Sequence, residues 1–208
     1  MGAETRGAPR VTILDFLRHG EPVGGKRYRG QTDDPLSDKG WTQMLAATAG
    51  ERPWQAIVTS PLARCRAFAE RLAAEARLPL GVEPGLMEVG FGAWEGLTGA
   101  EINRHGPDTV FDFKRDPLAG RPLGAESLET FSLRVASAYE GILAAHAGKQ
   151  VLVVAHAGVI RMVVCHVLGL APERAYRINV GSAAMARVKV EQRGEKRLDT
   201  LLWINQGA

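Results

Sequence analysis

The segment LRHGEP, residues 17–22, contains side chains that could bind and attack a phosphate. It places Arg18 and His19 at the end of an apolar run, where a buried strand is expected to stop. An arginine fork pairs with two phosphate oxygens at once, and a neutral imidazole is a competent nucleophile toward phosphorus. The imidazole needs one free ring nitrogen, with the other held by a hydrogen bond that sets the tautomer. The pair therefore indicates phosphoryl transfer if other segments complete the site.

Two further positions add groups that suit a phosphate. Arg64 lies one turn into an expected helix, and His156 follows VLVVA, part of the most strand-like segment of the chain. Ligands of parallel sheets bind beyond the carboxyl ends of the strands, so these side chains are expected to meet Arg18 and His19 in one crevice. A helix N-terminus there would add free N–H groups that favour anions. Two arginines and two imidazoles suit a phosphate dianion better than a carboxylate.

Hydrolysis of a phosphate ester also needs an acid that protonates the departing alcohol. Glu88, in the segment GLMEVGFGAWEG (residues 85–96), is the strongest candidate because glycines and apolar residues surround it. A positioned general acid accelerates such a reaction by about 10²–10⁴-fold. Glu95, in the same segment, is a rival that the sequence alone barely separates from Glu88.

The elements that must position these residues alternate between strands and helices. We expect strands at 11–17, 56–60, 151–156 and 183–190, and helices at 37–50, 60–76, 127–148 and 158–170. Ser60 is expected to cap the second of these helices. The alternation predicts an α/β fold, a three-layer α/β/α sandwich with a mostly parallel central sheet.

The remaining segments set the boundaries of the domain. Residues 1–10 are expected to be a flexible tail, and residues 11–208 to form a single domain. Within it, the segment of about residues 98–127 is predicted to be a helical cap over the crevice. Five of its side chains could select the alcohol part of a substrate: Phe111, Phe113, Lys114, Arg115 and Arg121.

Composition narrows the class of protein. The 208 residues are 45% hydrophobic and 24% charged, which is ordinary for a globular domain. There is no run of about 18 apolar residues and no apolar leader, so we expect a cytoplasmic protein without a membrane span. Two cysteines in no metal-type spacing predict neither a disulfide framework nor a metal site. The net charge of +3 is scattered, and its densest run, GKRYRG at 25–30, is a solvated loop or a rim that attracts an anionic substrate.

Four motifs in order, LRHGEP, TSPLARCRAFA, LMEVGFGAWEG and VVAHAGVIR, resemble the histidine phosphatase superfamily in its phosphoglycerate-mutase-like branch. The resemblance runs from about residue 12 to 190 and implies a three-layer α/β sandwich. It also implies a metal-independent phosphomonoesterase that needs no cofactor and works through a phosphohistidine. By the same resemblance, the nucleophile is His19, the proton donor is Glu88, and the phosphate pocket consists of Arg18, Arg64 and His156.

The first loop departs from the mutase pattern. Pro22 stands where Ser or Thr is common, and Gly25 stands where an Asn often touches the phosphate. Gly30 and Gln31 could still edge the pocket. Mutases are usually longer, so we favour hydrolysis of a small phosphorylated substrate. The segments GKRYRGQTDDPLS and EVGFGAWEG look most like the alpha-ribazole phosphatases of cobalamin biosynthesis, which remove a 5′-phosphate.

Other functions remain open at this point. A cofactor-dependent phosphoglycerate mutase would keep the same site and pass the phosphoryl group to a different acceptor. A broad-specificity phosphatase would accept many small esters. A phosphate-binding scaffold without catalysis would keep the fold, although no catalytic position is substituted. We expect no nucleic-acid or membrane partner, and we leave a homodimer open.

Overall fold

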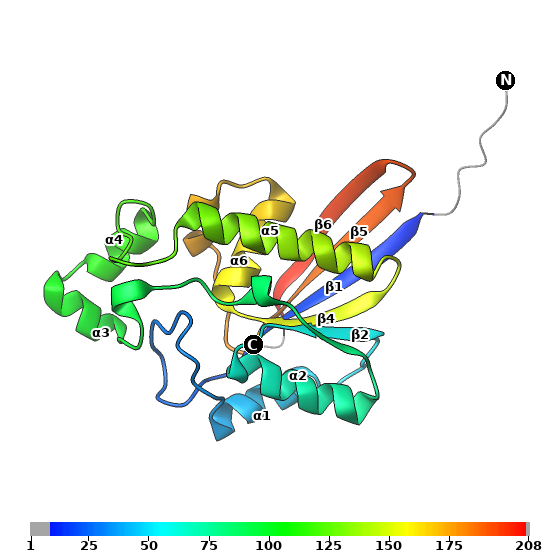
Figure 1. Cartoon of the computed structure of the whole chain (residues 1–208), viewed down its shortest axis with the longest axis horizontal. Coiled ribbons are helices and arrows are strands. Elements are labelled where there is room, and N and C mark those ends of the chain that lie inside the picture. Colours follow the sequence, from blue (N-terminus) through cyan, green and yellow to red (C-terminus); the bar gives the residue numbers. More distant parts are fainter. Residues whose placement is uncertain (1–8, 207–208) are drawn as a thin grey trace.

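The computed structural model describes residues 9–206 as a six-stranded sheet with helices on both faces (Figure 1). The strand order is β3–β2–β4–β1–β5–β6. The strands are β1 (Arg10–Arg18), β2 (Ala56–Thr59), β3 (Leu80–Val82), β4 (Gln150–Ala155), β5 (Met185–Arg193) and β6 (Lys196–Gln206). The first four are parallel, whereas β5 and β6 each run antiparallel to their preceding neighbour in the sheet. The predicted α/β fold with a central sheet between helices is confirmed.

Two pairs of helices form the outer layers. The helices α1 (Asp38–Ala47) and α2 (Ala63–Ala76) cover one face, and α5 (Leu128–Ala145) and α6 (Ala157–Leu168) cover the other (Figure 1). Side chains alternate along each strand, so each face has a core of its own. Leu17 belongs to the core beneath α2, and its neighbour Phe16 belongs to the core beneath α5 and α6. The central strands therefore lie between two hydrophobic cores. Polar functional groups can reach solvent only at the ends of these strands.

A cap of short helices stands beyond one end of the sheet (Figure 1). It contains α3 (Gly99–Ile102), the 3₁₀ turn η3 (Asn103–His105) and α4 (Thr109–Arg115). The fully buried Phe113 anchors it, because its ring lies 4.5 Å from that of Tyr176 and 5.2 Å from that of Trp94. Tyr176 lies within the 3₁₀ turn η4 (Pro172–Arg177). The turns η1 (Pro84–Leu86) and η2 (Gly92–Trp94) flank Glu88. The segment 98–127 thus contains helices, and one aromatic side chain ties it to the domain.

Several boundaries differ from the sequence prediction. The helix α2 begins at Ala63, not at Ser60, and the expected cap by Ser60 is wrong because Leu62 occupies that position. The sequence pattern predicts neither β3 nor β6, since β3 has three residues and β6 mixes polar and apolar side chains that are nowhere fully buried. The predicted tail of residues 1–10 falls mostly outside the described residues, and Arg10 opens β1.

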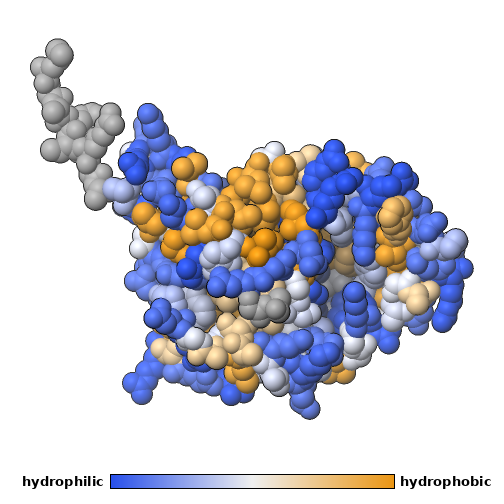
Figure 2. All heavy atoms as spheres, turned by 180° about the vertical axis from the view of Figure 1, so that it is seen from behind, coloured by the Kyte–Doolittle hydropathy of each residue, from blue (hydrophilic) through white to orange (hydrophobic). Residues whose placement is uncertain are grey.

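Strand β6 forms one edge of the sheet and has exposed apolar side chains. Leu198 is 61% exposed and Leu202 is 45% exposed. Figure 2, the view from behind, shows hydrophobic residues gathered over the upper middle of that face and hydrophilic residues around them. An edge strand with apolar side chains can pair with another chain, and the homodimer stays a prediction. No helix within residues 9–206 is long and apolar enough to cross a membrane.

A buried carboxylate joins the three central strands. Asp15 of β1 is fully buried and accepts hydrogen bonds from four donors. Gln150 Nε2 of β4 donates at 2.9 Å, and Arg187 of β5 donates from Nε at 2.6 Å and from Nη2 at 3.0 Å. The indole N–H of Trp54, in the loop before β2, donates at 2.8 Å. Every acceptor position of this buried charge is therefore used to hold neighbouring segments in register.

Replacing Asp15 by alanine should destabilise the fold because it leaves these donors without their acceptor. We expect the free energy of unfolding to fall by about 3 kcal/mol, a typical loss when one partner of a buried ion pair is removed. The control Arg66→Ala removes an exposed ion pair with Glu70 one turn along α2 and should cost less than about 1 kcal/mol. Urea denaturation measures both losses, and equal losses in the two variants would contradict this reading.

Candidate active site

His19 stands at the carboxyl end of β1 and is held in one ring orientation. Its Nδ1 donates to the carbonyl oxygen of Gly20 at 2.7 Å, which leaves Nε2 as the free ring nitrogen. A Cβ on Gly20 would lie 2.2 Å from the carbonyl oxygen of Gly40 in α1, so only glycine allows this close approach. The side chain is buried but not sealed, at 7% exposure. The ring is thus presented as a tautomer with its lone pair available.

The charge state of His19 follows from its surroundings. Burial is the first cause that holds the pKa of His19 well below its usual value, and the guanidiniums of Arg64 and Arg18 are the next causes. A buried imidazolium beside two cations is unfavourable, so the neutral ring dominates at neutral pH. A neutral imidazole is the form that a nucleophile requires.

Arg64 is the second residue of α2 and is 1% exposed. Its Nη1 donates to the carbonyl oxygen of Thr32 and its Nη2 to that of Gly30, both at 2.7 Å. Gly30 has a φ of +54°, in the left-handed region that favours glycine, and a Cβ there would overlap the carboxylate of Glu95. The Nε of Arg64 is buried and has no hydrogen-bond partner within residues 9–206. A charged donor left over at a cleft suits an anionic ligand.

Arg18 directly precedes His19, and its guanidinium is held by the loop that contains Val180. Its Nη1 donates to the carbonyl oxygen of Val180 at 2.7 Å, and its buried Nε has no partner among the described residues. Burial first, and then the guanidinium of Arg161, lower the pKa of Arg18 to about 10. The group therefore still carries its charge at neutral pH and offers a second unmatched donor near His19.

His156 packs behind His19 at the N-terminus of α6. The two rings meet edge to face with their centroids 5.1 Å apart. His156 is fully buried, and its Nε2 is hydrogen-bonded to Ser60 Oγ at 2.7 Å. Burial, and then the charge of Arg64, hold the pKa of His156 well below its usual value. Ser60, which the sequence pattern predicts as a helix cap, instead orients the neutral ring of His156. That ring in turn packs against the ring of His19.

Glu88, in the segment between η1 and η2, lies at the same cleft as His19 and contacts the N-terminus of α6. Its Oε2 accepts from the backbone N–H of Gly158, in the first turn of α6, at 3.1 Å, and its Oε1 accepts from the N–H of Val89 at 3.0 Å. A Cβ on Gly158 would lie 2.2 Å from Oε1, so glycine is needed for the carboxylate to sit against the helix. The carboxylate lines the cleft together with His19.

The rival carboxylate, Glu95, has a different environment. It accepts hydrogen bonds from the backbone N–H groups of Gln31, Thr32 and Phe91 and from the hydroxyl of Thr32. These four bonds tie the loop near Gly30 to the segment that follows Glu88. Glu95 is absent from the lining of the cleft, so the structure separates the two carboxylates where the sequence does not.

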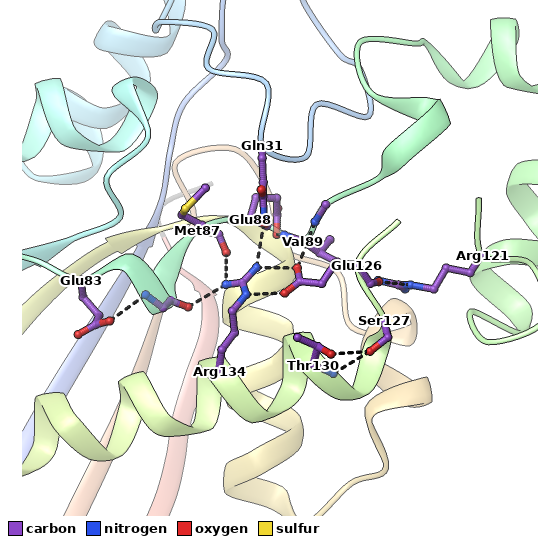
Figure 3. A network of polar contacts seen from close by, with 12 residues as sticks. Gln31, Glu83, Met87, Glu88, Val89, Arg121, Glu126, Ser127, Thr130 and Arg134 are labelled. Atoms are coloured by element: carbon purple, nitrogen blue, oxygen red, sulfur yellow. Dashed lines mark hydrogen bonds and ion pairs between the residues drawn. The ribbon is translucent and has the colours of Figure 1, made fainter. Parts of the chain in front are cut away.

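Arg134 of α5 clamps the segment that contains Glu88 (Figure 3). Its guanidinium donates to the carbonyl oxygens of Gly85, Met87 and Glu88 at 2.9, 2.7 and 3.0 Å. It also forms an ion pair with Glu126 at 2.6 Å. Sequence reasoning missed this arginine because a charged residue within an amphipathic helix looks like an ordinary surface charge. Its function is to hold irregular backbone that has no strand or helix partner of its own.

Asn205 of β6 is a second residue that sequence reasoning missed. Its Oδ1 accepts from the N–H of Gly181 at 2.9 Å, and its Nδ2 donates to the carbonyl oxygen of Asn179 at 2.8 Å. These two bonds bracket Val180, whose carbonyl holds Arg18. The end of the last strand therefore supports the loop on which a phosphate-binding candidate rests, and only the fold brings residue 205 to residue 18.

These groups surround one cleft of about 720 Å³. Among the predicted site residues, its lining includes Arg18, His19, Gly30, Arg64 and Glu88. The other two lie outside the lining: His156 is behind His19, and Gln31 lies beside the segment of Glu88, with its Nε2 at 3.4 Å from the Glu88 carbonyl oxygen. Seven basic side chains line the cleft against two acidic ones, Glu21 and Glu88; the basic ones are Arg18, Lys26, Arg27, Arg29, Arg64, Lys114 and Arg161.

Only one of the five cap side chains singled out for substrate selection faces this cleft. Lys114 lines it, whereas Phe113 is buried as the anchor of the cap. Phe111 and Arg115 are exposed outside the cleft, and Arg121 donates to the carbonyl oxygen of Glu126. Chemically, the cleft can bind an anion, present a neutral imidazole to it, and place a carboxyl group beside both.

Comparison with known proteins places this arrangement in a family. A bifunctional protein of Mycobacterium tuberculosis is 34% identical over 186 residues, which are 87% of this chain and 50% of the relative. The chain thus spans about half the length of this relative. A 2,3-bisphosphoglycerate-dependent phosphoglycerate mutase of Gloeobacter violaceus is 34% identical over 183 residues, with 82% of each chain covered.

Solved structures of other proteins have the same fold as this chain. The native structure of a mycobacterial glucosyl-3-phosphoglycerate phosphatase is 27% identical, with a TM-score of 0.82 over 95% of this chain and 99% of that chain. An alpha-ribazole phosphatase from Shigella flexneri is 23% identical, with a TM-score of 0.78 over 94% and 97%, a likeness of fold alone. Residues 14–203 match the family model described as histidine phosphatase superfamily, branch 1, and the chain belongs to that superfamily.

Proposed function

We propose that the chain is a metal-independent phosphomonoesterase that passes the phosphoryl group through His19 to water. The observation that carries this proposal is the state of His19, whose Nδ1 is tied to the Gly20 carbonyl while Nε2 remains free at a cleft with Arg18 and Arg64. Family membership and the phosphatases among the relatives support it.

The substrate phosphate would bind first to the two arginines. Arg18 and Arg64 each have a buried Nε without a partner among the described residues, and both line the cleft. A phosphate ester carries roughly −1.5 to −2 charge at neutral pH, which two guanidiniums balance. Charge-assisted hydrogen bonds of this kind contribute about 1.5–3 kcal/mol each, enough to hold the phosphorus in front of the imidazole.

Two displacements at phosphorus then complete the reaction. In the first, the Nε2 lone pair of His19 forms a bond to phosphorus as the ester P–O bond breaks, and Glu88 gives its proton to the departing alkoxide. In the second, water attacks the phosphorus, Glu88 takes up the proton of that water, and the N–P bond breaks. Inorganic phosphate leaves, and the imidazole and the carboxyl group return to their starting states.

The finer substrate prediction, alpha-ribazole 5′-phosphate, is one candidate substrate of such a phosphatase and is tested in a panel of esters. The same panel should include glucosyl-3-phosphoglycerate and phosphoserine, because the relatives include phosphatases for both. The alternative activity, phosphoglycerate mutase, is favoured by the 34% identity to a mutase. Measurement of 3-phosphoglycerate conversion with and without 2,3-bisphosphoglycerate separates mutase from phosphatase, since only a mutase produces 2-phosphoglycerate.

Substitution of His19 by alanine should abolish hydrolysis, because it removes the neutral imidazole whose free Nε2 accepts the phosphoryl group. We expect kcat/KM for an aryl phosphate to fall by at least about a thousandfold, while EDTA leaves the wild-type rate unchanged. The control His146→Ala removes an imidazole that lies outside the cleft and should retain the wild-type rate. Full activity of the His19 variant would overturn the proposal.

Glu88→Gln should show a loss that depends on the leaving group. An alkyl alkoxide needs a proton as it departs, so we expect about 10²–10⁴-fold slower hydrolysis of alkyl esters. A nitrophenolate leaves without one, so p-nitrophenyl phosphate should be affected much less. The matched control is Glu95→Gln, which loosens a loop and should change both esters by the same factor. The role of Glu88 is refuted if its variant also slows both esters equally.

The two buried imidazoles should remain neutral as the pH is lowered. Their folded-state pKa values lie below the unfolded value of about 6.5, so the unfolded chain binds more protons below that pH. The free energy of unfolding should therefore fall as the pH drops through that range. NMR titration of the imidazole rings tests this directly, and a midpoint at or above pH 6.5 for either His19 or His156 would be inconsistent with it.

A further inference from the structure

Three cations line the cleft outside the phosphate pocket and have no carboxylate partner within residues 9–206. They are Lys26, Lys114 and Arg161. The other basic residues of the cleft wall differ, since Arg27 pairs with Glu101 at 3.7 Å and Arg29 pairs with Asp34 at 2.8 Å. The carboxylate of Glu21 also has a partner, Lys39, at 3.0 Å. The cleft therefore has more positive charge than its own carboxylates balance.

Arg161 is placed to bind a ligand in the cleft. It lies one turn after Ala157 on α6, so the two residues share the helix face that lines the cleft. Its Nε donates to the carbonyl oxygen of Ile178 at 2.8 Å, and its guanidinium lies over the ring of Tyr176 at 5.6 Å. The two Nη groups make no hydrogen bond to the described residues. The side chain is thus oriented by two contacts while its terminal donors remain available.

Lys114 approaches the cleft from the cap. It lies one turn after Val110 on α4, and both residues line the cleft. The preceding residue, Phe113, packs against Tyr176, the same ring over which the guanidinium of Arg161 lies. The partly buried ring of Tyr176 therefore contacts both elements that present these cations, which places Arg161 and Lys114 at the cap end of the cleft.

The phosphate alone does not account for this charge. Arg18 and Arg64 already match the roughly −2 charge of a phosphate monoester. Arg161 is close enough to Arg18 that its charge, after burial, is the next cause that lowers the pKa of Arg18 to about 10. Like charges in such proximity destabilise each other unless an anion lies between or beside them. Glu88 offsets part of this repulsion, and a substrate with a second negative group beside Arg161 would offset more of it.

We propose that the alcohol part of the substrate has a carboxylate, which Arg161 and Lys114 bind at the cap end of the cleft. The substrate class is then a phosphorylated hydroxy acid. A carboxylate offers two oxygens in a plane, which suits the paired Nη donors of an arginine. This inference rests on the proposed phosphatase function and narrows it, since it disfavours esters of neutral alcohols such as alpha-ribazole 5′-phosphate.

The test compares two alkyl esters that differ mainly in charge. 3-Phosphoglycerate has a carboxylate where glycerol 3-phosphate has a hydroxymethyl group. For the wild-type protein we expect kcat/KM to be at least about tenfold higher for the carboxylate ester, from one charge-assisted contact. The ratio of the two values, rather than either value alone, reports the proposed subsite.

Two variants assign the preference to the subsite. Lys114→Met keeps the length of the side chain and removes its charge without breaking a hydrogen bond between described residues, so the fold should be retained. Arg161→Gln is the second variant. Each should lower the ratio by about tenfold. The control Lys149→Met removes an equal charge from an exposed position outside the cleft and should leave the ratio as it is in the wild type.

The outcomes separate this inference from the proposed function. A ratio near one in the wild type, or an unchanged ratio in both cleft variants, overturns the carboxylate subsite while hydrolysis itself continues. If alpha-ribazole 5′-phosphate is the best ester of the panel, the subsite is also refuted. If the wild-type protein hydrolyses no ester at all, including p-nitrophenyl phosphate, the proposed function itself fails.

Discussion

The hydrogen bond from His19 Nδ1 to the carbonyl of Gly20 is the interaction on which the site depends. It sets the tautomer, and burial beside Arg18 and Arg64 then keeps the ring neutral. Burial, together with the same two cations that would attract a phosphate, thus disfavours protonation of the nucleophile before the phosphate arrives. The cost is a set of buried charges with unmatched donors, which a bound dianion would satisfy.

The loops around this hydrogen bond are held in place by contacts from other parts of the fold. Gly20 lies against α1 only because a glycine faces it there, and the carbonyl that orients Arg18 belongs to a loop held by Asn205. Arg134 does the same for the segment of Glu88. The site is therefore assembled from loops, and each of these loops is held by a contact from another part of the fold.

The sequence predicts the parts of the site that follow apolar runs. Arg18, His19 and His156 are placed because a buried parallel strand is recognisable and its carboxyl end is where ligands bind. The sequence does not separate Glu88 from Glu95, because their difference lies in which distant N–H groups they meet. Strand β6 has no fully buried residue, so neither the strand nor the support that its Asn205 gives to the loop of Val180 could be predicted.

The most direct test of the account is the identity of the phosphorylated residue. Wild-type protein mixed with a saturating aryl phosphate should be quenched in base, which preserves phosphohistidine, and then digested and analysed by mass spectrometry. The account predicts one phosphoryl group, on His19, and none in the His19→Ala variant. A phosphoryl group on any other residue, or turnover without a phosphorylated histidine at any time after mixing, would contradict it.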